Sequence, residues 1–200
     1  MYDFYGVYAA CRDAAWRCHL DFGISRLPVR LKAITTSAGI RIVRNSDAEE
    51  LRDGERGASI CVNNIWTLIY DDSLPSSESR MVVAHELGHI LLGHDYKYAG
   101  CRFPESDKKQ KSEREADMFA VRLLAPACIL HEIGVMSAAG IAELCDIPAP
   151  AAAARARRMG ELEKRSKFYQ SALEAEVAAR FSAFIAEKRA LSDGNPSSFR

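Results

Sequence analysis

The chain has 200 residues, 48% of them hydrophobic, and its 27 basic and 27 acidic side chains give a formal net charge of zero. This length suits one domain with an appended segment, and a neutral chain lacks the basic excess of general nucleic-acid or anionic-membrane binders. No run of 18 apolar residues predicts a transmembrane helix, and the N-terminus lacks the basic and apolar regions of a signal peptide. We therefore expect a cytoplasmic protein whose six cysteines are free thiols.

The first third of the chain predicts two helices followed by a small sheet. Apolar residues at helical spacing indicate a helix from about residue 3 to 22, which Gly23 ends. Pro28 suits the first turn of a second helix that runs through Ser37.

Strands are expected at 39–44, 58–62 and 65–70, with a tight turn between the last two. The charged segment 45–57 is interpreted as a loop with one helical turn. The edge of such a sheet can pair with an extended peptide through backbone hydrogen bonds, and we expect Ile65–Tyr70 to be that edge.

The segment 81–94 holds the pattern His-Glu-x-x-His in an apolar run of helical character. Residues four apart share a helix face, so His85 and His89 can direct their imidazoles at one cation. Glu86 can then reach a water on that cation, an arrangement typical of zinc peptidases. The alternative is a chance pattern of core histidines. Gly88 costs the helix roughly 0.8–1.0 kcal/mol relative to Ala, which indicates that a strand or substrate approaches there.

A catalytic zinc commonly has three protein ligands, and several residues after the motif are candidates for the third. His94 does not fit the metzincin spacing, so we expect it to end the helix or line the cleft. Glu113 is favoured, because it lies on a separate predicted helix with Asp117 four residues later on the same face. This spacing is similar to that of thermolysin-like zinc peptidases, which implies that the Glu binds metal and that the Asp holds the far nitrogen of a ligand histidine. Glu115 points about 200° away from Glu113 and is disfavoured. The alternative is an ordinary acidic first turn of a helix capped by Ser112.

Residues 96–112 are polar and are interpreted as a solvated loop, with a mobile lid as the alternative. Two short helices joined by a turn are predicted over 137–159, a pattern that resembles a helix-turn-helix. Arg155, Arg157 and Arg158 suit DNA only partly in an Ala-rich helix, so a packing role is favoured.

An amphipathic pattern from 161 to about 191 predicts one long helix, which closes the domain or mediates dimerisation, before a frayed tail. The expected fold class is α+β, a mainly helical zincin-like domain with a small three-stranded sheet. We place this domain at residues 1–135, the helix-turn-helix-like segment packed on it at 136–160, and the C-terminal helix and tail at 161–200.

The motif helix, together with Glu113-Arg114-Glu115-Ala116-Asp117-Met118-Phe119-Ala120 and Leu123-Leu124-Ala125-Pro126, resembles the ImmA/IrrE metallopeptidases. The resemblance covers about residues 25–160, and Ala125 stands where that family often has Met. The Glu-x-x-x-Asp spacing is also similar to that of thermolysin-like zinc peptidases. This implies a Zn²⁺-dependent endopeptidase with His85, His89 and Glu113 as metal ligands. Glu86 would be the general base, and Asp117 would orient a ligand histidine.

The resemblance also implies a substrate, a helix-turn-helix transcriptional repressor whose cleavage releases mobile-element, phage or stress genes. A residue that stabilises the oxyanion is expected, with Tyr96, Tyr98, His94 and His131 as candidates. The competing hypothesis is a non-proteolytic, zinc-containing regulator that binds a repressor or antitoxin partner, although a structural metal site has no need of Glu86. Direct DNA binding is disfavoured by the neutral charge.

Overall fold

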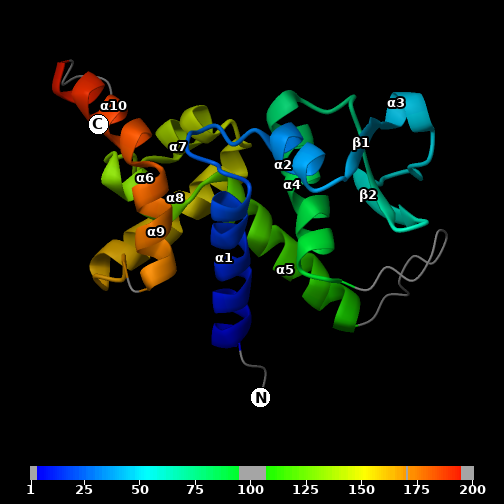
Figure 1. Cartoon of the computed structure of the whole chain (residues 1–200), viewed down its shortest axis with the longest axis horizontal. Coiled ribbons are helices and arrows are strands. Elements are labelled where there is room, and N and C mark those ends of the chain that lie inside the picture. The colour runs from blue at the N-terminus through cyan, green and yellow to red at the C-terminus, as the bar shows by residue number, and fades with distance from the viewer. Residues whose placement is uncertain (1–3, 95–106, 170, 195–200) are drawn as a thin grey trace. The chain divides into compact units, whose positions relative to one another are not determined.

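The computed structural model describes residues 4–94, 107–169 and 171–194. The chain forms two compact units, one made of Met1–Ala14 with Arg30–Ala120 and the other of Ala15–Val29 with Val121–Arg200. Helices α1 (Phe4–Asp21) and α5 (Asp107–Leu124) each contribute residues to both units. The described chain is mainly helical with one three-stranded sheet, which confirms the expected α+β class (Figure 1). The boundaries expected at 135 and 160 stay a prediction.

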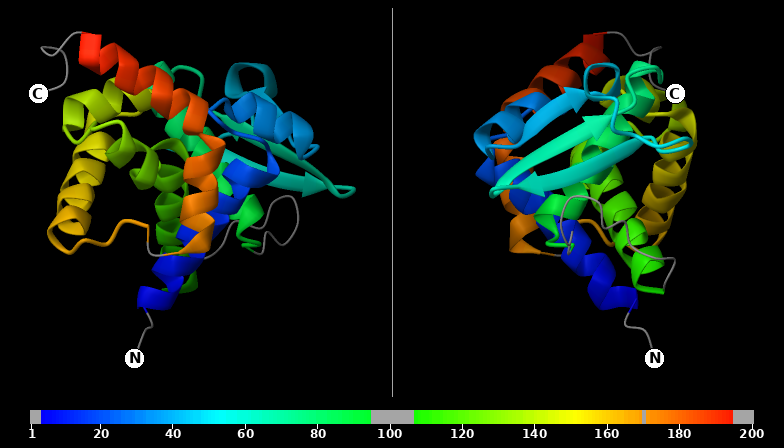
Figure 2. Two further views of the ribbon diagram at one scale, coloured as in Figure 1. Left: turned by 60° about the vertical axis from the view of Figure 1, so that its left-hand side comes forward. Right: turned by 90° about the vertical axis from the view of Figure 1, so that its right-hand side faces the viewer.

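The sheet lies in the first unit and has the strand order β1–β3–β2, with β1 (Arg41–Arg44), β2 (Gly57–Val62) and β3 (Ile65–Tyr70) (Figure 2). β2 and β3 form an antiparallel hairpin, and Asn63 and Asn64 at its turn have φ values of 51° and 61°, as a two-residue hairpin turn of this kind requires. β1 pairs with β3 in parallel, so the sheet is mixed.

The expectation that Ile65–Tyr70 is an edge strand is wrong, because β3 is the central strand. The segment that contains α3 (Asn45–Ala48) carries the chain from β1 across to the far side of β3 before β2 begins. Leu68 and Ile69 are consecutive and both buried, which is typical of a strand covered on its two faces. β1 and β2 are therefore the edges.

Helix α4 (Ser76–Leu91) packs on β2 and β3, and α2 (Leu31–Ser37) contacts both α4 and β1. α2 begins three residues later than predicted, since Pro28 precedes it and Arg30 is its N-cap. The expected helical turn within 45–57 is present as α3. α5 begins at Asp107, so the loop prediction is wrong for residues 107–112, and Ser112 lies inside this helix and does not cap it. Residues 96–106 of the predicted loop lie outside the described ranges.

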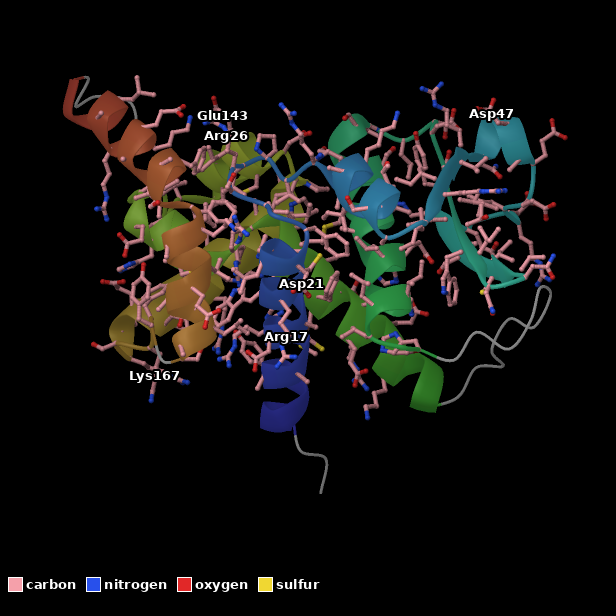
Figure 3. The ribbon with its side chains drawn as sticks, in the orientation of Figure 1. Arg17, Asp21, Arg26, Asp47, Glu143 and Lys167 are labelled. Carbon is pink, nitrogen blue, oxygen red and sulfur yellow. The ribbon has the colours of Figure 1, made fainter. Side chains whose placement is uncertain are left out.

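The second unit contains the remaining helices: α6 (Ala127–Glu132), α7 (Ala138–Cys145), α8 (Ala149–Lys164), α9 (Ala172–Arg180) and α10 (Ser182–Gly194). α7 and α8 are the predicted helix-turn-helix-like pair, and they pack against each other. Arg155 of α8 is buried, and its Nε donates to the carbonyl of Ala125 at 2.7 Å. This arginine therefore anchors α8 to the end of α5, which supports the packing interpretation. Arg26, labelled in Figure 3, pairs with Glu187 of α10 at 2.9 Å.

The single long helix predicted over 161–191 is wrong, because three helices share this stretch. α8 ends before Lys167 (Figure 3), and Tyr169 has a φ of 57°, which no helix continues through. Ser171 then starts α9, since its hydroxyl accepts the backbone N–H of Glu174 at 3.2 Å. The Ser-x-x-Glu spacing at this point is the sequence signature of a helix start. The apolar stripe thus runs across a break.

Five cysteines lie in the part of the chain that the structure describes, and all are free thiols, as expected: Cys11, Cys18, Cys61, Cys128 and Cys145. Cys101 lies outside that part. None of the helices within the described ranges has the length and hydropathy needed to cross a bilayer.

Candidate metal centre

Helices α4 and α5 bring together the three residues that the sequence selects as metal ligands. The Nε2 atoms of His85 and His89 lie 3.0 Å apart. The Oε2 atom of Glu113 lies 3.2 Å from Nε2 of His85 and 3.7 Å from Nε2 of His89. One ligand atom from each residue can therefore face a common point, with all three atoms within 4.8 Å of one another.

Gly88 explains how Glu113 reaches the histidines from a separate helix. A Cβ atom at Gly88 would lie 3.0 Å from Cδ1 of Phe119 and 3.3 Å from the Cα and carbonyl oxygen of Ala116. α5 therefore contacts α4 directly at Gly88, which lies between His85 and His89 in the sequence of α4. The expectation of a strand or substrate at Gly88 is wrong, because a helix occupies that space.

The nitrogen of each imidazole that faces away from Glu113 has its own hydrogen-bond partner. His85 Nδ1 donates to Oδ1 of Asp117 at 2.8 Å, the contact expected of Asp117. His89 Nδ1 lies 2.9 Å from Nδ1 of His94, and Nε2 of His94 lies 3.0 Å from Oε2 of Glu115. Both rings are thereby fixed with Nε2 directed at Glu113. The sequence interpretation missed these roles of His94 and Glu115.

The electrostatics of the cluster suit a cation. Burial alone would lower the pKa of His85, but its hydrogen bonds to Asp117 and Glu113 outweigh burial and raise the pKa to about 10. The hydrogen bond from His85, with the His89 imidazole also nearby, holds the pKa of Glu113 below its usual range. A positive charge is therefore favoured between these groups. Two imidazoles and one carboxylate are also the donor set of many catalytic zinc sites, so the residues fit such a metal.

Glu86 lies against β2, on the side of α4 that faces the sheet. Its side chain is buried, and Ser59 Oγ donates to its Oε2 at 2.7 Å. A Cβ atom at Gly57 would lie 2.5 Å from Cγ1 of Val82 and 3.1 Å from Cγ of Glu86, so only glycine lets β2 pass this close. Burial raises the pKa of Glu86, and the hydrogen bond from Ser59 opposes the rise. The sequence interpretation missed Gly57 and Ser59, although a glycine in a strand can mark such a close approach.

Two of the four candidates for oxyanion stabilisation lie in the described part of the chain. Tyr96 and Tyr98 lie outside the described residues. Both ring nitrogens of His94 are engaged, which leaves neither to face a substrate. His131 belongs to the second unit, where its Nε2 pairs with Glu163 at 3.1 Å and its ring stacks on Phe168.

Comparison with known proteins gives one family match. The model of the Peptidase M78 family, described as an IrrE N-terminal-like domain, matches residues 35–137. The matched stretch contains the sheet, α4 and α5, and with them every residue of the candidate metal centre. No curated protein matches the chain in sequence.

Proposed function

The chain belongs to the ImmA/IrrE family of metallopeptidases, and from this premise we propose that it is a zinc endopeptidase that cleaves a helix-turn-helix transcriptional repressor. The observation that carries the proposal is the position of Glu86, a buried carboxylate one residue after a candidate ligand. It lies close enough to His85, His89 and Glu113 to interact with their charges. A structural metal site has no use for such a carboxylate.

The proposed metal ligands are His85, His89 and Glu113. When bound, zinc supplies the Lewis acidity that polarises the scissile carbonyl and activates water. Asp117 keeps Nδ1 of His85 occupied, so that its Nε2 keeps a lone pair for the metal.

The proposed general base is Glu86, which takes a proton from the attacking water and returns it to the leaving amine. Ser59 holds Oε2 of this carboxylate, which fixes its orientation and leaves Oε1 to carry the proton. The buried position keeps the carboxyl away from bulk water and raises its pKa towards the range in which a group can both accept and return a proton.

Edge strand β2 is the proposed site at which the substrate backbone binds. β2 pairs with β3 on one side, and within the described ranges no strand pairs with its other side. Its residues Gly57 and Ser59 lie against Glu86, so an extended peptide added to this edge would pass near the catalytic carboxylate. This supports an endopeptidase, which must accept chain on both sides of the scissile bond.

The test starts from the open reading frames that neighbour this gene, among which a helix-turn-helix repressor is sought. That repressor is co-expressed with the wild type or with Glu86→Gln and is then analysed by mass spectrometry. We expect the wild type to cut the repressor at one position, and Glu86→Gln to keep its zinc and leave the repressor intact. Undiminished cleavage by Glu86→Gln would reject the role of Glu86. Binding of the repressor without cleavage by either protein would favour the non-proteolytic regulator.

A further inference from the structure

The hydrogen-bond partner of His89 is a second histidine, whereas that of His85 is a carboxylate. His94 Nδ1 lies 2.9 Å from His89 Nδ1, with the two ring centroids 4.9 Å apart. On its far side, His94 Nε2 lies 3.0 Å from Oε2 of Glu115. The three residues therefore form a chain of hydrogen bonds from Glu115 on α5, through His94, to the candidate ligand His89 on α4.

The end of α4 explains why a residue five positions after His89 can touch its ring. Gly93 has a φ of 68°, and its N–H donates to the carbonyl of Ile90, while the N–H of His94 donates to the carbonyl of His89. These two bonds form a Schellman motif, a helix ending in which the residue after the glycine folds back over the last turn. That motif usually brings two apolar side chains together. Here it brings together two imidazoles, so the turn itself positions His94.

The chemistry of Glu115, His94 and His89 determines which ring nitrogens carry a hydrogen atom. A carboxylate only accepts, so His94 Nε2 carries the hydrogen that it donates to Glu115. In neutral His94, Nδ1 is then an acceptor, and the hydrogen between the two rings belongs to Nδ1 of His89. His89 Nε2 is left with a lone pair, directed at the point that His85 and Glu113 also face.

We propose that His94 and Glu115 are positioning residues that fix the orientation and tautomer of His89 and thereby strengthen metal binding. The proposal rests on the proposed function only in taking His89 as a metal ligand. Glu115 is kept in place by Lys111, whose Nζ lies 3.6 Å from Oε1, the oxygen that does not face His94. His94 and Glu115 thus do for His89 what Asp117 does for His85.

The test is zinc affinity, measured by competition with a chromophoric chelator, for the wild type and for two His94 variants. His94→Phe keeps a ring but removes the acceptor, and we expect it to weaken zinc binding about 10- to 100-fold, the usual effect of losing such a partner. His94→Asn places an amide oxygen near the position of Nδ1 and should restore most of the affinity. His131→Phe, the same exchange in the other unit, should leave the affinity unchanged. Equal affinities of the wild type and His94→Phe would overturn the proposal.

A second readout needs no metal. In metal-free wild type, NMR of ¹⁵N-labelled imidazoles should show His89 protonated on Nδ1, and His94→Phe should shift His89 towards the Nε2–H form. An unchanged tautomer in His94→Phe would also overturn the proposal. If the wild type bound no zinc, the proposed function would fail, whereas the tautomer of His89 would still decide the role of His94.

Discussion

Replacing Gly88 by alanine tests the contact that brings Glu113 to the two histidines. The added Cβ would lie 3.0 Å from the Phe119 ring and 3.3 Å from backbone atoms of Ala116. The ring can shift, but the backbone of α5 can yield only if that helix moves away from α4. Glu113 lies one turn from Ala116 on α5, so it would move with the helix.

Two opposing effects set the magnitude. Alanine gains about 0.8–1.0 kcal/mol over glycine from helix propensity, and overpacking a core contact costs about 1–3 kcal/mol. We therefore expect Gly88→Ala to lower the free energy of unfolding by about 1 kcal/mol. In this variant zinc binding requires α5 to return to its position against α4. If that movement costs about 1.4 kcal/mol, the zinc affinity falls about tenfold.

Gly160→Ala is the matched control, because Gly160 lies inside α8 and a Cβ there meets nothing within 4 Å. It should raise the free energy of unfolding by about 0.8–1.0 kcal/mol and leave zinc affinity unchanged. Urea denaturation of the metal-free proteins and chelator competition measure the two quantities. If Gly88→Ala stabilised the protein as much as Gly160→Ala, the close contact between α4 and α5 would be refuted.

Three further predictions concern the interior. Burial lowers the pKa of His19 from 6.5 to about 4. As the pH falls, the unfolded chain therefore binds a proton on this histidine before the folded chain does. The contribution of the neutral ring to stability is lost between pH 6.5 and 4. His19→Gln, whose amide can still donate to the Leu123 carbonyl, should lose less stability than the wild type between pH 7 and 4.5 in urea denaturation without metal, and equal losses would contradict this. Ser59→Ala should keep zinc but lower kcat about 10- to 100-fold, the value of a hydrogen bond to a charged group, and an unchanged kcat would refute the positioning of Glu86. Arg155→Met should cost about 1–3 kcal/mol in urea denaturation by leaving the Ala125 carbonyl without this donor, whereas exposed Arg157→Ala should change stability by less than about 0.5 kcal/mol; equal effects would place Arg155 on the surface.

The features predicted well from the sequence are those that local spacing determines. The 3.6-residue repeat places His85 beside His89 and Glu113 beside Asp117, and the paired asparagines mark the β2–β3 hairpin. Each of these relations involves residues close together in the chain.

The features missed depend on contacts between distant segments. The strand order depends on where the chain between β1 and β2 crosses, which no periodicity records. Ser59 on β2 contacts Glu86 on α4, and Gly88 on α4 contacts α5, a helix whose residues lie almost thirty positions later in the chain. The prediction of one long C-terminal helix is wrong for the opposite reason. It followed the apolar pattern and overlooked the local helix start at Ser171.

The central claim is that His85, His89 and Glu113 together hold one catalytic metal ion. Elemental analysis of protein purified from zinc-supplemented cells tests it most directly, with Glu113→Ala beside the wild type. We expect about one zinc per wild-type chain and a large loss in Glu113→Ala. A wild type without metal, or a Glu113→Ala protein that retains zinc as tightly as the wild type, would contradict the account.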